Sequence, residues 1–105
     1  MNNTLNQVNK IYRIKNPSAY IKITKKNLNG WVKSREKFLF YLKFPIKMFK
    51  ESSLLDLGSG SGLYTLAYNI FGANCTLVEY EKKFCLDSNN LFKILSKKNY
   101  KIINK

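Results

Sequence analysis

The chain has 105 residues, which is enough for one domain with a small core. Hydrophobic residues make up 45% of it and aromatic residues 14%, a composition that excludes an intrinsically disordered tail. No run approaches the roughly 20 apolar residues of a membrane-spanning helix, and residues 1–10 contain no stretch of signal-peptide length. We therefore expect a cytoplasmic protein without a membrane span.

The chain is strongly basic. Nineteen Lys and Arg residues face six acids, and the formal net charge of +13 suits a nucleic acid, an anionic membrane surface or an acidic partner. The basic residues are spread along the chain without an arginine cluster, and Asn and Ile are abundant as well. Two interpretations stay open: a basic binding face, or a codon bias toward Lys, Asn and Ile.

Cys75 and Cys85 are ten residues apart, without a CxxC spacing, and the sequence contains no His. This pattern predicts neither a metal site nor a disulfide framework. Two buried free thiols are expected.

Residues 1–30 are polar and rich in Asn and Lys, and their apolar positions follow no sustained period. They are expected to form a loosely packed arm with one or two short elements. Pro17 follows Asn16, a pair that starts turns or helices, and Asn29–Gly30 predicts a turn or a helix cap.

From Trp31 onward apolar residues recur at helical spacing, which predicts a helix. Pro45 predicts that this helix ends near Lys43, or kinks there before a short second turn that carries Met48 and Phe49.

The remaining residues alternate between strand and helix patterns. Gly72 follows a predicted helix at a position where the backbone needs a positive φ. Such alternation requires parallel strands joined by right-handed crossovers, so the fold class is α/β, with a Rossmann-like and incomplete parallel sheet. The predicted elements are strand 54–57, helix 63–71, strand 75–78, helix 82–98 and strand 100–103.

The motif most relevant to function is Asp56-Leu57-Gly58-Ser59-Gly60-Ser61-Gly62, directly after the first predicted strand. Glycines allow a tight turn and let a ligand approach the main chain without a Cβ in the way. A helix that begins near Gly60 would direct its free N–H groups at the turn, where a carboxylate or phosphate is stabilised.

Glu79 ends the second predicted strand, 23 residues after Asp56. Open α/β folds place an acid at this position to accept hydrogen bonds from ribose hydroxyls. The ends of two neighbouring strands would thus hold one nucleoside. A dinucleotide fingerprint would need its third glycine where Leu63 stands, and no Gly-Lys-Ser/Thr of a P-loop follows Gly58.

At these residues the sequence resembles the class I S-adenosylmethionine-dependent methyltransferases, whose first motif is acid-x-Gly-x-Gly-x-Gly and whose second is an acid ending strand two. The resemblance divides the chain into an arm, residues 1–30, and the amino-terminal part of a methyltransferase domain, residues 31–105. It implies S-adenosylmethionine as the cofactor. The implied cofactor-binding residues are Asp56, Gly58, Ser59, Gly60, Gly62, Glu79 and Tyr80.

The resemblance also implies individual roles. The backbone around Gly58, Ser59 and Gly60 would contact the methionine moiety, and Asp56 would orient the turn and the cofactor's amino group. Glu79 would bind the ribose. Tyr80 matches the position whose side chain usually lies against the adenine.

The chain is expected to end within strand three, before the strand-four motif that borders the transferred methyl group in this family. We therefore expect an amino-terminal fragment that is inactive alone and leaves apolar faces exposed. Its catalytic residues are unknown, and its methyl acceptor is more readily a small molecule than RNA or protein. Two alternatives stay open: a non-catalytic binding module whose sheet is completed by a partner chain, and a basic nucleic-acid-binding protein.

Overall fold

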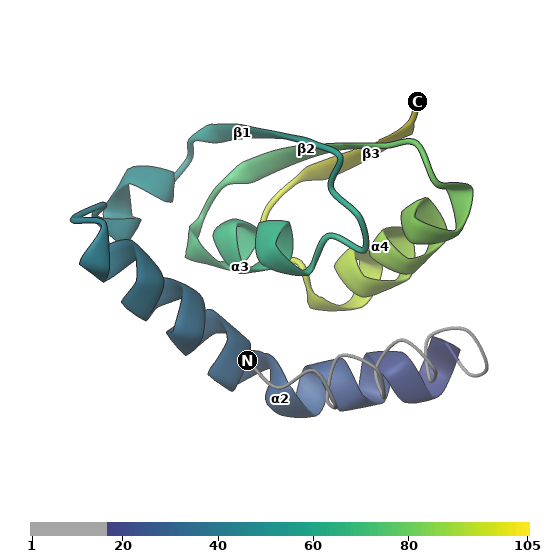
Figure 1. Ribbon diagram of the computed structural model, residues 1–105, viewed down its shortest axis with the longest axis horizontal. Helices are drawn as coiled ribbons and strands as arrows, with labels where there is room; N and C mark the ends of the chain where they lie inside the picture. The colour runs from purple at the N-terminus through teal and green to yellow at the C-terminus, as the bar shows by residue number, and fades with distance from the viewer. Residues whose placement is uncertain (1–16) are drawn as a thin grey trace.

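The computed structural model describes residues 17–105, with side chains described from Ile21 onward. The first 16 residues of the predicted arm lie outside this range. Strands and helices alternate after residue 52, as the sequence predicts (Figure 1). The elements are α2 (Pro17–Tyr41), the 3-10 helix η1 (Ile46–Phe49), β1 (Ser53–Leu57), α3 (Leu63–Phe71), β2 (Asn74–Glu79), α4 (Lys82–Leu95) and β3 (Tyr100–Asn104).

The three strands form one parallel sheet in the order β1-β2-β3. Leu54 pairs with Cys75, which in turn pairs with Tyr100. Figure 1 shows α3 and α4 on one face of the sheet and α2 as a further layer beyond them. The α/β class is therefore confirmed, and within residues 17–105 the other face of the sheet carries no helix.

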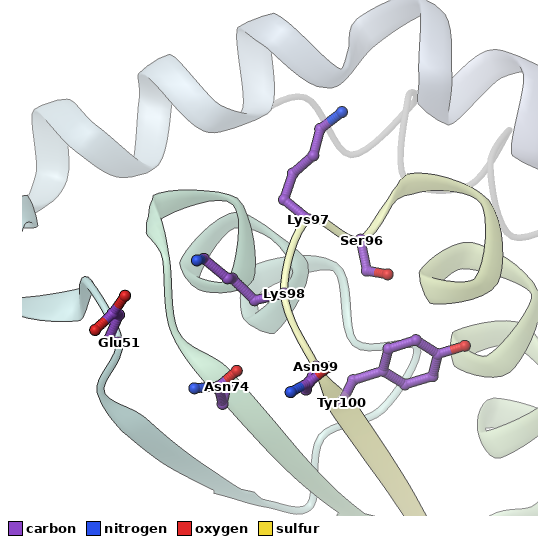
Figure 2. Close-up of a pocket in the computed structure, with 7 residues that line it drawn as sticks. All are labelled: Glu51, Asn74, Ser96, Lys97, Lys98, Asn99 and Tyr100. Atoms are coloured by element: carbon purple, nitrogen blue, oxygen red, sulfur yellow. The ribbon is translucent and has the colours of Figure 1, made fainter.

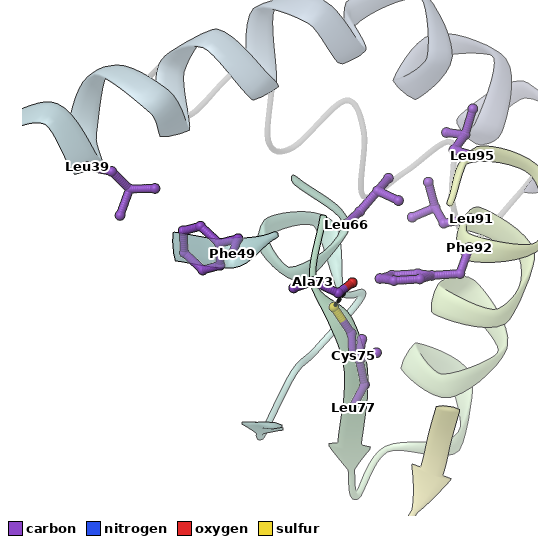
Figure 3. Packing of buried hydrophobic residues seen from close by; sticks show 9 residues of the cluster. All are labelled: Leu39, Phe49, Leu66, Ala73, Cys75, Leu77, Leu91, Phe92 and Leu95. Atoms are coloured by element: carbon purple, nitrogen blue, oxygen red, sulfur yellow. Dashed lines mark hydrogen bonds between the residues drawn. The ribbon is translucent and has the colours of Figure 1, made fainter. Parts of the chain in front are cut away.

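Side-chain alternation along the strands explains this layering. Cys75 and Leu77 of β2 point toward the helices and are buried, whereas Leu55 and Leu57 of β1 point the other way and are 62% and 72% exposed. The core lies between sheet and helices, as Figure 3 shows. Its buried members are Leu39, Phe49, Leu66, Ala73, Cys75, Leu77, Leu91, Phe92 and Leu95.

The turn predicted at Asn29–Gly30 is wrong, because both residues lie inside α2. Gly30 does not have a left-handed φ, and a Cβ there would meet nothing within 4 Å. Leu28 packs against the core on one side of this pair and Trp31 contacts the ring of Tyr64 on the other, so tertiary contacts outweigh the local preference. Figure 1 shows α2 changing direction part-way along its length.

The predicted break before Pro45 is confirmed. α2 ends at Tyr41, and Lys43 takes a left-handed φ of 57°. The Phe44 N–H donates to the Leu39 carbonyl at 2.9 Å and the Lys43 N–H to the Phe40 carbonyl at 3.0 Å, which together form a Schellman motif. The short helix η1 then brings Phe49 into the core.

Helix α4 is shorter than predicted and ends at Leu95, three residues before Lys98. The physical reason is Asn69 of α3, a fully buried side chain. Its Oδ1 accepts the N–H groups of Lys97 and Lys98 at 2.8 and 3.0 Å, which removes both from the helix and turns the chain toward β3.

Cys75 and Cys85 are buried free thiols, as predicted. Burial raises the pKa of both, so each thiol stays protonated and packs as a small apolar group.

Candidate functional site

The predicted glycine turn lies at the carboxyl edge of the sheet, between β1 and α3. Gly58, Gly60 and Gly62 all have left-handed φ values, of 73°, 60° and 79°. The N–H groups of Gly58 and Ser59 donate to the Val78 carbonyl of β2 at 2.8 and 3.2 Å. The turn is thus bound to the neighbouring strand by its own backbone, and its shape depends on glycine.

The three glycines have different surroundings. A Cβ at Gly58 or Gly60 would meet nothing within 4 Å, so both face open space. A Cβ at Gly62 would lie 2.8 Å from a methyl carbon of Leu77 and 3.2 Å from the ring of Phe92. Gly62 therefore allows α3 to pack against β2 and α4, while Gly58 and Gly60 leave the main chain accessible.

Two groups at the turn lack a partner. The Oγ of Ser59 is buried and has no hydrogen bond within the described residues. Helix α3 begins at Leu63, later than the start near Gly60 that the sequence suggested, and its N-cap Gly62 has no side chain to accept the first free N–H groups. The helix N-terminus and the serine hydroxyl can therefore both serve a polar ligand.

Asp56 anchors the turn from the strand side. Its Oδ2 accepts a hydrogen bond from the Oγ1 of Thr65, a buried residue in the first turns of α3. This contact ties the end of β1 to the helix. Thr65 was not predicted from the sequence, although a hydroxyl nine residues after the acid, in the following helix, is a recognisable signal.

Glu79 ends β2 beside the turn and is only 7% exposed. Its Oε1 accepts the Gly60 N–H at 2.7 Å, and its Oε2 accepts the Glu81 N–H at 2.7 Å. These N–H groups, that of Glu81 first and that of Gly60 second, lower the pKa of Glu79 against the opposing effect of burial. The structure thus brings the acid and the glycine turn into direct contact.

Tyr80 directly follows β2, and Asn104 is the last residue of β3. Tyr80 is 81% exposed, so its ring is free to contact a ligand at this edge. The Nδ2 of Asn104, at the end of β3, donates to the carbonyls of Glu79 and Tyr80 at 3.0 and 2.8 Å. Asn104 was not predicted from the sequence, although its place at the end of a parallel strand is a signal for such a residue.

A hollow of about 910 Å³ lies at the opposite, amino edge of the sheet. Figure 2 shows its lining residues, which come from the start of each strand or the loop before it. No buried polar group without a partner faces it among the described residues, in contrast to the glycine turn. Within residues 17–105 no group of three or more His, Cys, Asp and Glu side chains could hold a metal ion.

Neither a protein-family model nor a curated protein matches the sequence. Solved structures do match. The magnesium protoporphyrin IX methyltransferase ChlM of Synechocystis PCC 6803, solved with bound SAH, is 14% identical over 79% of this chain and 38% of its own, with a TM-score of 0.55. The described residues have the fold of part of a class I methyltransferase.

Two further structures share this methyltransferase fold. A protein of Methanococcus maripaludis, provisionally assigned as an S-adenosyl-L-methionine-dependent methyltransferase, is 14% identical over 87% of this chain and 41% of its own, with a TM-score of 0.55. The phosphoethanolamine N-methyltransferase 1 of Haemonchus contortus was solved in complex with phosphoethanolamine and S-adenosylhomocysteine. It is 13% identical over 95% of this chain and 21% of its own, with a TM-score of 0.50. The chain therefore spans about a fifth to two fifths of these proteins.

No helix in residues 17–105 combines the length and the apolar character needed to cross a bilayer.

Proposed function

We propose that the chain binds S-adenosylmethionine at the glycine turn and forms the cofactor-binding part of an S-adenosylmethionine-dependent methyltransferase. One observation carries the proposal: Gly58 and Gly60 hold left-handed conformations while facing open space, next to the buried carboxylate of Glu79. A glycine that only shaped the turn would need no open space beside it. A backbone approached by a ligand does.

The residues of this edge fit the cofactor. The backbone of Gly58, Ser59 and Gly60 would contact its methionine part, and the unpartnered Oγ of Ser59 would gain a hydrogen bond there. Gly62 would contribute only through its backbone, because its Cα faces the core. S-adenosylhomocysteine bound in two of the similar structures supports this choice of ligand.

Glu79 and Tyr80 would hold the nucleoside part. Each carboxylate oxygen of Glu79 accepts one backbone N–H and has a further lone pair for a ribose hydroxyl. Its lowered pKa keeps the carboxylate ionised, which is the acceptor form. The exposed ring of Tyr80 would lie against the adenine, and Asp56 would keep the turn in place through Thr65.

S-adenosylmethionine supplies a methyl group already activated by its sulfonium, so the protein's contribution is mainly to hold acceptor, methyl carbon and sulfur in line. The residues of this chain would fix the cofactor end of that line. The acceptor side would lie on further chain or on a partner, and a small molecule is favoured over RNA or protein as the acceptor. A cytoplasmic location fits the two free thiols.

Calorimetric titration with S-adenosylhomocysteine tests the proposal. Wild-type chain is expected to bind, and Gly58→Ala and Gly60→Ala to weaken binding at least tenfold, because each methyl group would occupy the space the ligand needs. Gly30→Ala is the matched control, since that glycine also faces open space but lies in α2. Equal affinity of all four proteins, or no binding by the wild type, would contradict the proposal.

A second candidate is a non-catalytic module whose sheet is completed by another chain. It is favoured by β1, which is an edge strand of the described sheet, and by the exposed Leu55 and Leu57 beside that edge. Light scattering distinguishes the two candidates. A stable complex that forms through β1 and whose assembly is unaffected by Gly60→Ala would support the module.

A further inference from the structure

The charge of the chain is unevenly distributed. Residues 17–50, which form α2, η1 and the turn between them, contain nine basic side chains and one acidic side chain, a net charge of +8. Residues 51–105 contain seven basic and five acidic side chains, a net charge of only +2. Most of the positive charge of the described residues thus lies outside the sheet and its two covering helices.

The same segment exposes large apolar side chains where α2 ends. Phe40 is 79% exposed, Tyr41 74%, and Leu42 and Met48 60% each. Together with the partly exposed Phe44 we call these residues the apolar tip. Two adjoining hollows of about 490 and 510 Å³ share Phe40, Phe44 and Pro45 as lining residues.

Lysines surround the apolar tip. Lys37 lines one hollow, Lys43 lines the other, and Lys47 follows in η1. A long lysine side chain can lay its methylenes along apolar surface while its ammonium group reaches a phosphate. Glu36, the only acid among residues 17–50, lines the same hollow as Lys33 and Lys37. The basic side chains outnumber it, so the surface as a whole attracts anions.

We propose that the apolar tip and its lysines dock the protein on a membrane surface rich in anionic phospholipid. Aromatic and aliphatic side chains would enter the boundary between headgroups and acyl chains, while Lys37, Lys43 and Lys47 pair with lipid phosphates. The tip lies at the amino edge of the sheet and the glycine turn at the carboxyl edge (Figure 1), so docking leaves the turn accessible.

Two features favour lipid over a nucleic acid as the partner. Beside the more exposed rings of Phe40 and Tyr41, the tip presents Leu42 and Met48. These two aliphatic side chains insert among acyl chains but offer no ring for base stacking. The only arginine of residues 17–50 is Arg35, whose guanidinium lies 4.1 Å from the ring centroid of Tyr64 and 4.7 Å from that of Phe38. The guanidinium is therefore held against the protein's own rings rather than presented to a nucleic acid.

Flotation with vesicles tests the proposal with the full chain at about 0.15 M salt. Vesicles of phosphatidylcholine with 30% phosphatidylserine are expected to bind the protein, and vesicles of phosphatidylcholine alone are not. Lys43→Gln with Lys47→Gln is expected to weaken binding about thirtyfold, from about fivefold for each lysine at an anionic surface. Phe40→Ser with Tyr41→Ser is expected to weaken it at least tenfold.

Matched controls lie elsewhere on the fold. Lys82→Gln with Lys83→Gln removes the same charge from the start of α4, and Leu55→Ser removes an apolar side chain of the sheet that is 62% exposed. Both are expected to bind vesicles like the wild type. Equal losses in tip and control variants, absence of binding to anionic vesicles, or tip-dependent binding of a single-stranded RNA without vesicle binding would each overturn the proposal.

Discussion

Both edges of the sheet contain glycines with a positive φ, but these glycines have different roles. At the amino edge, Gly72 has a φ of 123° and packs so closely that a Cβ would lie 2.9 Å from the Cα of Lys50. Asn69 lies beside it, and both the oxygen and the nitrogen of its side-chain amide form hydrogen bonds with the protein's own backbone. At the carboxyl edge, Gly58 and Gly60 are equally dependent on positive φ but face open space, and the Oγ of Ser59 has no partner. Polar groups and space left unused distinguish the proposed ligand site from the packed turn.

The largest expected effect tests the packed edge. The Nδ2 of Asn69 donates to the carbonyls of Ala73, Lys98 and Asn99, and its Oδ1 accepts two N–H groups. Asn69→Ala leaves these buried groups unpaired and is expected to lower the free energy of unfolding by about 4 kcal/mol, measured by urea denaturation. Asn90→Ala, at an exposed position of α4, is the control. A loss below about 1 kcal/mol would show that water replaces the side chain.

The second prediction compares two glycines of one turn. Gly62→Ala combines a left-handed φ with a clash against Leu77, and is expected to cost about 3 kcal/mol of unfolding free energy. Gly60→Ala has the strain without the clash and is expected to cost about 1 kcal/mol. For S-adenosylhomocysteine affinity the order is expected to be reversed, with Gly60→Ala weakening binding more than Gly62→Ala. Each variant is measured below its unfolding transition. Equal costs for both variants would remove the distinction between packed and open glycines.

The order of strands and helices was predictable from the sequence because glycine punctuation and apolar periodicity are local signals. The glycine turn and the acid at the end of β2 were predictable for the same reason. Three features were not. The continuation of α2 through Asn29–Gly30 depends on contacts with α3, and the early end of α4 depends on Asn69, 28 residues before Lys97. That Gly62 faces Leu77 and Phe92 depends on packing between three elements.

Glu79 shows what a motif can and cannot indicate. Its position predicts an acceptor for a nucleoside, and the structure adds that both carboxylate oxygens already hold the backbone of Gly60 and Glu81. No spacing rule contains this contact, because it depends on how the turn folds back over β2. The acid therefore also stabilises the turn, so its removal tests the stability of the carboxyl edge as well as ligand binding there.

Glu79→Gln is expected to lower the free energy of unfolding by about 2 kcal/mol at pH 7, because it weakens two charge-assisted hydrogen bonds. The pKa of Glu79 is lowered in the folded protein, so its contribution is complete above the ordinary glutamate pKa of about 4.3 and is lost as the pH falls through the lowered value. Urea denaturation from pH 7 to pH 3 is expected to show the difference between the two proteins shrinking. Glu81→Gln, in the same loop, is expected to change the pH 7 value by less than about 0.5 kcal/mol. A difference that grew toward low pH would contradict the geometry.

The smallest expected effect concerns Lys43, which occupies a left-handed position where a glycine fits better. Lys43→Gly is expected to raise the free energy of unfolding by about 1 kcal/mol, because it relieves backbone strain in the Schellman motif at the end of α2. Lys37→Gly, an exposed position inside the same helix, is expected to lower it by about 0.8 kcal/mol, so thermal or urea denaturation gives opposite signs for the two lysines. Lys43→Gly is also expected to weaken attachment to anionic vesicles. A more stable variant that binds membranes less well would mean that Lys43 contributes to membrane contact and not to the stability of the fold. A loss of stability would mean that the left-handed conformation is not strained.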